Sequence, residues 1–323
     1  MGKTIAVVVT FNREKLLQNC IEALRAQTQP LDAILVVNNG STDNTDLWLQ
    51  QQKDLHVISQ SNLGSGGGFN TGIKWAFANG YQWIWCMDDD GYPSPNALEK
   101  LFEACPQHEL TLLNCMVVDK DNPNKLVWKT MQYTHLSQID TPLVYGKGHP
   151  FNGTLLSRQI IERVGLPNKK YFLWGDETEY FYRITRRNKI PVASVTASIH
   201  HHPATAFSLK QDWSFSSSWK MYYYVRNRLA IHRAKFGNSL VALSCYLGFI
   251  LAFAGVILFY QKTNRRQKLI FLAWPVADAF RNKYTDTPVS ILEGIKQKKY
   301  SNLRRMFNWS SWTRQEKPSP ALG

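Results

Sequence analysis

The first 90 residues alternate short apolar runs with segments of helical spacing, and this alternation restricts the fold more than any other feature. Ile5–Thr10 is β-branched and uncharged, which is typical of a strand buried on both faces. Arg13–Gln27 carries apolar residues at helical spacing. Ala33–Val37 and Trp83–Met87 are further apolar runs of strand length. Strands that alternate with helices predict an open, mostly parallel α/β sheet.

Weaker signals lie between these strands. They predict a helix over Asp43–Gln52, a short strand over Val57–Ser59, a glycine-rich loop over Asn62–Gly68 and a helix over Thr71–Asn79. Ligands of such sheets bind beyond the carboxyl ends of the strands. Because polar clusters follow three of the strands, we expect the functional residues at that edge.

Three adjacent carboxylates, Asp88, Asp89 and Asp90, follow the fourth apolar run. They repel one another, so a buried strand end with this sequence is costly unless a cation lies nearby. A divalent ion with oxygen ligands would offset the repulsion and could hold a diphosphate. A solvated acidic turn is the alternative, and the triplet alone does not decide between the two.

Three other segments could carry chemistry. The glycines of 64–68 would allow close approach of a ligand, but they match neither a dinucleotide fingerprint nor a P-loop, and a surface loop is the simpler reading. Residues 174–180 place three carboxylates among aromatic side chains, which could raise a pKa toward that of a general base or simply begin a helix. His200–His202 could supply a metal ligand.

The net charge of +14 lies entirely in residues 213–323, since residues 1–212 are balanced. The five cysteines form no CxxC pair, which favours reduced thiols in the cytoplasm over disulfides or a thiolate zinc site. The apolar run at the N-terminus is too short for a signal peptide and predicts that the first domain begins at once.

The order of these motifs closely resembles the family 2 glycosyltransferases, which are inverting, nucleotide-sugar-dependent enzymes of the GT-A fold. The resemblance covers roughly residues 3–235 and is carried by Ile5–Arg13, Val36–Asp43, Asn62–Gly72, Asp88–Asp90 and Trp174–Arg183. Residues 62–69 and 172–177 look most like the galactofuranosyl- and rhamnosyltransferase branches.

The resemblance implies a nucleotide-sugar site at the turns after the first two strands, the glycine segment and the acidic triplet. Its residues would be Thr10, Asn12, Arg13, Asn39, Asp43, Asn62, Gly64, Gly67, Asn70, Asp88 and Asp89. The family usually has an acidic residue at Asn38 or Asn39 that reads the pyrimidine ring. An amide can still accept from the ring N3–H but brings no charge.

The resemblance also implies a divalent cation, Mn²⁺ or Mg²⁺, held by Asp90, Asp88 and His200, with His201 as the next choice. The catalytic base would lie in the Asp176–Glu177 pair, where the spacing to Arg183 favours Glu177. Asn152, Gly153 and Trp174 would line the junction between donor and acceptor.

The activity implied is a single in-line displacement with inversion at the anomeric carbon. The donor would be UDP-galactofuranose or another UDP-hexose, with dTDP-rhamnose next, and the acceptor a hydroxyl of a lipid-linked glycan in bacterial surface polysaccharide synthesis, such as lipopolysaccharide or capsule. A sugar nucleotidyltransferase is the alternative enzyme. A non-catalytic scaffold is disfavoured because the carboxylates at 88–90 and 176–177 are intact.

The basic last third contains Ser239–Tyr260, 22 residues without a charge, which as a helix would be about 33 Å long and could span a bilayer. Basic residues flank both of its ends, so the positive-inside rule gives no orientation. Leu269–Phe280 is too short to cross. Leu292–Phe307 has the pattern of a basic amphipathic helix. Aromatic residues would suit a belt at headgroup level, namely Trp213, Trp219, Tyr222–Tyr224, Trp309 and Trp312.

We therefore predict a GT-A catalytic domain over residues 1–212 and a basic helical region over 213–323 that holds it at the cytoplasmic face of the inner membrane, peripherally or through one span. The alternative for the long apolar helix is the core of an accessory domain. The positive charge also suggests a nucleic-acid-binding protein. Because that charge adjoins a long apolar segment and no RNA or DNA motif is visible, we expect an anionic membrane as partner and no nucleic acid.

Overall fold

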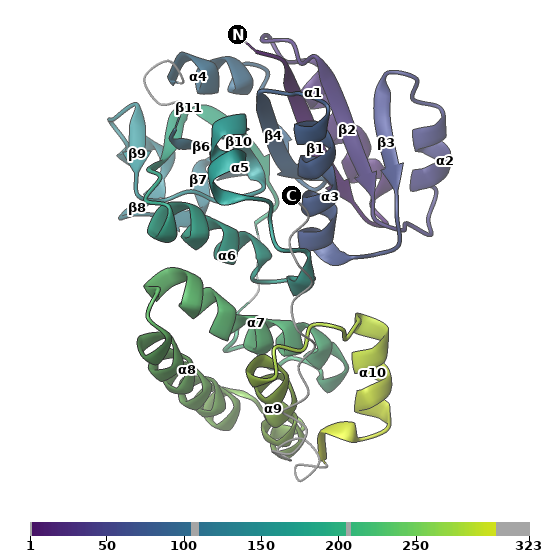
Figure 1. Cartoon of the computed structure of the whole chain (residues 1–323), viewed down its shortest axis with the longest axis vertical. Helices are drawn as coiled ribbons and strands as arrows, with labels where there is room; N and C mark the ends of the chain where they lie inside the picture. The colour runs from purple at the N-terminus through teal and green to yellow at the C-terminus, as the bar shows by residue number, and fades with distance from the viewer. Residues whose placement is uncertain (1, 105–109, 205–207, 302–323) are drawn as a thin grey trace.

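The structure, a computed structural model, describes residues 2–104, 110–204 and 208–301. A sheet with helices on both faces forms one end of the molecule, and an all-helical region forms the other (Figure 1). The described part contains an eleven-stranded sheet, whose main path runs β3-β2-β1-β4-β10-β6-β11-β5. The predicted α/β fold followed by a helical region is confirmed.

The first half of the sheet is parallel and matches the predicted order of elements. Its members are β1 (Thr4–Thr10), α1 (Glu14–Arg25), β2 (Ala33–Asn38), α2 (Thr45–Gln50), β3 (Leu55–Ser59), α3 (Gly64–Ala78) and β4 (Trp83–Asp88). The register pairs Thr10 with Asn38, and Val9 with both Val37 and Asp88. The carboxyl ends of β1, β2 and β4 therefore meet at one edge.

The second half of the sheet is mixed. Its members are β5 (Tyr92–Pro93), α4 (Ala97–Ala104), β6 (Leu112–Asp119), β7 (Asn122–Thr130), β8 (Tyr133–His135), β9 (Leu143–Tyr145), β10 (Asn152–Ser157), α5 (Arg158–Val164), α6 (Asp176–Tyr182) and β11 (Val192–His202). β10 is antiparallel to β4 and β6, whereas β11 is parallel to β6. The end of β11 pairs with β5, just beyond the acidic triplet. This pairing brings the three histidines to the same edge as the carboxylates.

The glycine segment is not the loop that the sequence suggested, because Gly64–Gly68 form the first turns of α3. The glycines allow this helix to lie very close to its neighbours. A Cβ at Gly68 would clash with Val9, and a Cβ at Gly72 would clash with Val7. Tight packing on β1 therefore outweighs the low helix propensity of glycine.

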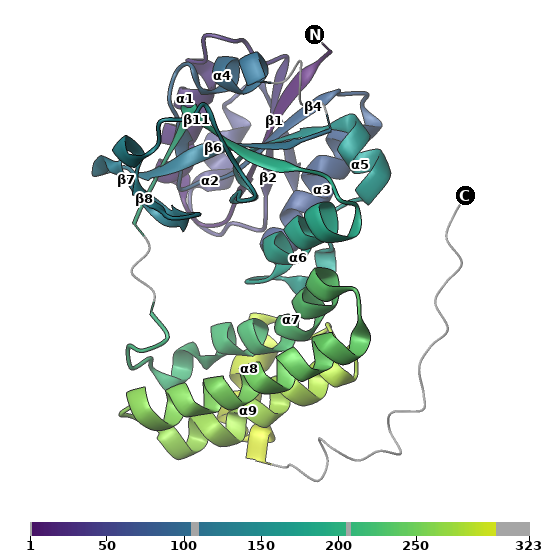
Figure 2. The same cartoon turned by 90° about the vertical axis from the view of Figure 1, so that its left-hand side faces the viewer.

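The helical region consists of α7 (Ser218–Phe236), α8 (Ser239–Tyr260), α9 (Arg265–Phe280) and α10 (Pro288–Lys296). Figure 2 shows α8 lying along α7 and α9. α7 also packs on α6, so it joins the two parts of the molecule. By length and composition, α8 is the one helix among the described residues that could cross a membrane.

Two expectations for this region are corrected. Trp213, Tyr222 and Tyr223 do not form an outward-facing belt, because they are buried against other helices. The predicted amphipathic helix over Leu292–Phe307 ends at Lys296 in α10. Its continuation, with Trp309 and Trp312, lies outside the described residues.

The packing of α3 gives a stability prediction. Gly72→Ala should lower the free energy of unfolding by about 1–3 kcal/mol, because the added methyl group overpacks the contact with Val7. The matched control is Gly248→Ala in α8, where a Cβ meets nothing within 4 Å. That variant should gain about 0.5–1 kcal/mol from helix propensity. Denaturant unfolding of both variants measures the difference, and equal effects would contradict the packing argument.

Candidate functional site

The turn after β4 is anchored to β1 through Asp89. Its carboxylate is 3% exposed and accepts hydrogen bonds from Thr10 Oγ1 at 2.7 Å and from Arg13 Nη1 at 2.9 Å. Arg13 Nη1 also donates to Asp90 Oδ2 at 2.7 Å. Asp89 and Thr10, both predicted to bind the nucleotide, are thus engaged by the protein itself and position the acidic turn. Arg13 supplies the positive charge that makes this turn tolerable.

The histidine beside Asp90 is His202, because its Nε2 lies 3.3 Å from Asp90 Oδ1. Burial alone would raise the pKa of Asp90, but the hydrogen bond and charge of His202 and the charge of Arg13 lower it on balance. His200 is fully buried, and neither of its ring nitrogens has a hydrogen-bond partner in the described structure. Burial lowers the pKa of His200 to about 3. The structure therefore brings His202, and not the expected His200, to Asp90, and which histidine binds a metal stays a prediction.

Asp88 lies among like charges. Burial raises its pKa well above the ordinary value, and the neighbouring carboxylates of Asp90, Asp89 and Glu177 raise it further. No group of three or more His, Cys, Asp or Glu side chains among the described residues is arranged to hold a metal ion. Carboxylate and imidazole groups are donor types that Mn²⁺ accepts, so Asp88, Asp90 and His202 have suitable chemistry, but the structure brings only His202 and Asp90 together.

The two candidate bases differ in their surroundings. Asp176 is 2% exposed and accepts a hydrogen bond from Ser65 Oγ at 2.7 Å. No hydrogen-bond donor among the described residues contacts the carboxylate of half-buried Glu177. Burial raises the pKa of Glu177 to about 8, and the charge of Asp176 contributes while Lys147 opposes the shift. Glu177 thus has the basicity and the unengaged oxygens of a general base.

The segment that leads into these carboxylates is held by α7. Asn227 Nδ2 donates to the carbonyl oxygens of Tyr171 at 3.0 Å, Leu173 at 2.9 Å and Trp174 at 3.3 Å. Arg226 Nη2 donates to the same Tyr171 carbonyl at 3.1 Å. Trp174 has a φ of 52°, a left-handed conformation that such contacts stabilise. Sequence reasoning missed this pair. The visible signal was an adjacent Arg and Asn that follow an aromatic run in a predicted helical segment.

The amide of Asn39 makes several hydrogen bonds within the protein. Its Nδ2 donates to Gly64 O at 2.9 Å, and its Oδ1 accepts from Gln60 Nε2 at 2.9 Å and Leu63 N at 3.1 Å. Asn62 Oδ1 in turn accepts from Gly64 N at 2.9 Å. The amide of Asn39 is therefore occupied in fixing the start of α3, and its contact with a pyrimidine ring stays a prediction.

The neighbouring amides are engaged in the same way. Asn38 Nδ2 donates to Asp46 at 3.0 Å, and Asn38 Oδ1 accepts from Ser41 N at 3.1 Å. Asn12 Oδ1 accepts from Thr42 N at 2.6 Å, while Asn12 Nδ2 donates to Thr42 Oγ1 at 3.2 Å. These bonds tie the turn after β1 to the turn after β2. The amides of these two turns, which were predicted to line the nucleotide site, therefore join the turns to each other and to α2.

Three other predicted donor-site residues have local partners. Asp43 Oδ1 accepts from Thr45 N at 3.1 Å at the start of α2. Asn70 Nδ2 donates to Pro167 O at 2.7 Å. A Cβ at Gly67 would clash with Leu63, the residue just before α3. Asn70 therefore ties α3 to the segment after α5, and Gly67 leaves room for Leu63 at the start of α3.

The predicted donor–acceptor junction lies where β10 begins beside the end of β4. Asn152 is 4% exposed, and its Oδ1 has no hydrogen-bond partner in the part of the chain that is described. Gly153 has a φ of +79°, and a Cβ there would lie 2.6 Å from Cys115 Sγ. Trp174 packs edge to face on Tyr224 of α7, with ring centroids 6.2 Å apart. Trp174 therefore contacts the helical region.

Known proteins resemble this chain in sequence. Residues 5–164 match the family model described as glycosyl transferase family 2. Galactofuranosyltransferase GlfT1 of Mycolicibacterium smegmatis is 31% identical over 212 residues, which cover 61% of this chain and 70% of that protein.

Solved structures agree on the fold. S. aureus TarS 1–349 in complex with UDP superposes with a TM-score of 0.54 at 14% identity, covering 99% of this chain and 94% of that one. In a longer TarS structure, the chain corresponds to 55% of the protein. GalNAc-T7 with UDP, GalNAc and Mn²⁺ has a TM-score of 0.51 at 15% identity and covers 70% of this chain. On its motifs, its GT-A fold and its relatives, this chain belongs to glycosyltransferase family 2.

Proposed function

We propose that this glycosyltransferase moves a sugar from a nucleotide-diphosphate sugar to a hydroxyl of a lipid-linked glycan, with inversion at the anomeric carbon. The observation that carries the proposal is the arrangement at the carboxyl edge of the sheet. A carboxylate with a pKa of about 8, Glu177, lies within electrostatic reach of an acidic cluster suited to a cation and a diphosphate. A base, and an acidic edge that can hold a cation for the diphosphate, are the two parts that such a displacement needs.

The donor proposal rests on the relatives. GlfT1 is named as a galactofuranosyltransferase, and both the TarS and the GalNAc-T7 structures contain UDP. We place UDP-galactofuranose or another UDP-hexose first and dTDP-rhamnose next. The acceptor would be a membrane-bound glycan of bacterial surface polysaccharide, because residues 213–323 carry the whole net charge of +14 and adjoin an apolar helix. These features support a site of action at the cytoplasmic face of the membrane.

In the proposed reaction, Glu177 accepts the proton of the acceptor hydroxyl while that oxygen bonds to the anomeric carbon and the bond to the diphosphate breaks. Asp88, Asp90 and His202 would hold a Mn²⁺ or Mg²⁺ ion, which would neutralise charge on the departing diphosphate. Ser65 fixes Asp176, and Asn227 fixes the segment before it, so Glu177 is presented from a rigid helix start. Asp89 and Arg13 keep the acidic turn in place.

The first functional prediction concerns the base. Purified protein offered a panel of nucleotide sugars should release UDP or dTDP from one of them, and Glu177→Gln should lower transfer by about 10²–10⁴-fold with donor affinity retained. A base acts when deprotonated, so the kcat/KM of the wild type should rise with pH and level off above the Glu177 pKa of about 8.

Asp176→Asn is the control for the position of the base. If this variant loses the pH dependence and Glu177→Gln keeps it, the base is Asp176. Formation of an activated sugar from a nucleoside triphosphate and a sugar phosphate would instead identify a nucleotidyltransferase.

The second prediction concerns the cation. After metal is stripped with EDTA, turnover should fall to background and return with added Mn²⁺ or Mg²⁺, because the diphosphate and the carboxylates repel each other. Asp90→Ala should lose cation-dependent donor binding as well as turnover, measured by titration calorimetry with UDP. His202→Ala should weaken the same binding more than His200→Ala does. Full turnover of the stripped protein would exclude the cation site.

The third prediction concerns the contact between α7 and the base segment. Asn227→Ala removes the donor shared by three carbonyls, so the segment before Asp176 should shift and kcat should fall about 10–100-fold. The KM for the donor should change less than about twofold, because Asn227 lies outside the predicted donor turns. Equal loss in kcat and in donor affinity, together with a large drop in Tm, would show general unfolding and contradict a positioning role.

A further inference from the structure

The outer face of α8 is apolar and uncovered. Its exposed large side chains include Leu240, Leu247, Leu251, Leu258 and Phe259, of which Leu240, Leu251 and Phe259 are 76%, 75% and 82% exposed. Leu240, Leu247, Leu251 and Leu258 are spaced by seven, four and seven residues, which places them on one side of the helix. The helix has a mean hydropathy of 2.4, yet only 22% of its most apolar window is buried. An apolar stripe of this length on a soluble surface marks an interaction site.

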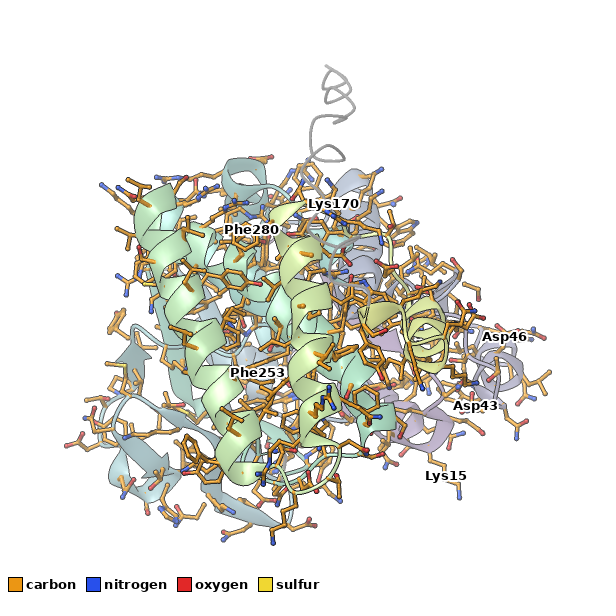
Figure 3. All side chains as sticks on the ribbon, turned by 90° about the horizontal axis from the view of Figure 1, so that it is seen from below. Lys15, Asp43, Asp46, Lys170, Phe253 and Phe280 are labelled. Carbon is orange, nitrogen blue, oxygen red and sulfur yellow. The ribbon has the colours of Figure 1, made fainter. Side chains whose placement is uncertain are left out.

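The inner face of α8 is fixed to the rest of the protein. Ala242, Tyr246, Phe253 and Ile257 are buried against neighbouring helices. From below, α8 and α9 lie side by side with Phe253 between them, and Asp43 and Asp46 lie at the opposite edge (Figure 3). An interfacial helix on its own needs a polar side toward water, but here the protein itself covers that side. This explains why α8 is apolar all round.

The two ends of α8 are also fixed. Gln261 Nε2 donates to Leu209 O at 3.1 Å and to Gln211 O at 2.9 Å, and Asn238 caps the first turn. Through Gly237 the helix folds back on α7, which carries Arg226 and Asn227 and is bonded to the base segment. If α8 stood upright in a bilayer, α7 and its charges would have to enter the hydrocarbon or this contact would have to break. Either change is costly.

Exposed basic residues lie at both ends of α8. Arg233 and Lys235 precede it, and Lys262, Arg265 and Arg266 follow it. For a spanning helix this symmetry gives no orientation, because one cluster would lie on each side of the bilayer. For a helix that lies flat, both clusters reach the same headgroup layer, where each cation contributes about 1 kcal/mol next to anionic lipid. The basic residues at both ends of α8 therefore fit a helix that lies flat on the membrane, and a spanning helix does not explain them.

We infer that α8 lies in the plane of an anionic bilayer, with the stripe Leu240–Phe259 among the acyl chains, and that the protein is monotopic. The inference deepens the membrane part of the proposed function and rests on it. The occupant is a lipid surface. The apolar stripe would contact the acyl chains, and the cations at both ends of α8 would contact anionic headgroups of the same leaflet. α8 and α9 form the underside of the molecule, so the sheet and its acidic edge are held above the membrane surface (Figures 1 and 2).

Vesicle binding tests the stripe. The purified full-length protein should sediment with vesicles of phosphatidylglycerol and phosphatidylcholine, and high salt should weaken this binding without abolishing it. Leu251→Glu should reduce binding at least about tenfold, because it removes the apolar transfer of one leucine and adds a charge. Leu47→Glu is the matched control, since Leu47 is 61% exposed on α2, and it should bind like the wild type. Unchanged binding of Leu251→Glu would overturn the inference.

Cysteine labelling tests the orientation. In a Cys105→Ser, Cys245→Ser background, Ser239→Cys and Lys262→Cys mark the two ends of α8, and the three remaining cysteines, 20, 86 and 115, are buried. In sealed inside-out vesicles from expressing cells, both marker cysteines should react fully with an impermeant maleimide before permeabilisation. If one end reacts only after permeabilisation, α8 spans the membrane and the inference is wrong.

The remaining outcomes separate this inference from the proposed function. The wild type could fail to bind vesicles and form a dimer that Leu251→Glu converts to a monomer. This result would show that a second copy covers the stripe, and it would overturn the lipid assignment. Sugar transfer to a soluble acceptor, measured by the UDP released, should be equal in Leu251→Glu and wild type, because Leu251 is 75% exposed on α8 and is not one of the site residues. If the wild type binds vesicles but transfers no sugar from any donor, the proposed reaction alone is contradicted.

Discussion

The crowding of three carboxylates at the end of β4 is the constraint on which the rest of the site depends. Folding brings Asp88, Asp89 and Asp90 to a partly buried edge where water cannot fully screen them. The protein neutralises only part of this charge. Arg13 and Thr10 satisfy Asp89, and Arg13 and His202 approach Asp90, while Asp88 is left among like charges. That residual negative charge makes the edge suited to a cation, and the cation could in turn hold a diphosphate.

The helical region also contacts the segment that carries the proposed base. α7 packs on α6 and, through Asn227 and Arg226, determines the path of the residues just before the base. Tyr222, Tyr223 and Trp274 form the core beneath it. The segment that carries Glu177 is therefore held in part by the lower bundle. A boundary drawn at residue 212 separates sequence compositions, but this contact crosses it.

The same bundle contains the helix that we propose to contact the membrane. α8 buries one apolar face against α7 and α9 and exposes another, so a single uncharged helix serves both as domain core and as a proposed lipid contact. The two readings of this helix from the sequence, core or membrane segment, are compatible because they concern opposite faces. An enzyme held in this way would work on acceptors close to the bilayer surface.

The sequence by itself determined the fold class, the order of the elements in the first half, the family, and the length of α8. These follow from local periodicity and from adjacent residues, such as the acidic triplet at the end of an apolar run. Tertiary structure decided which side chains meet. Gly64–Gly68 are helical only because α3 packs against Val9 and Val7, and Asn39 is occupied only because Gly64 and Gln60 lie beside it. His202 faces Asp90 because of the register between β11 and β5, and Asn227 reaches the base segment from more than 50 residues away. Contacts between distant segments depend on packing and register, and no local pattern encodes them.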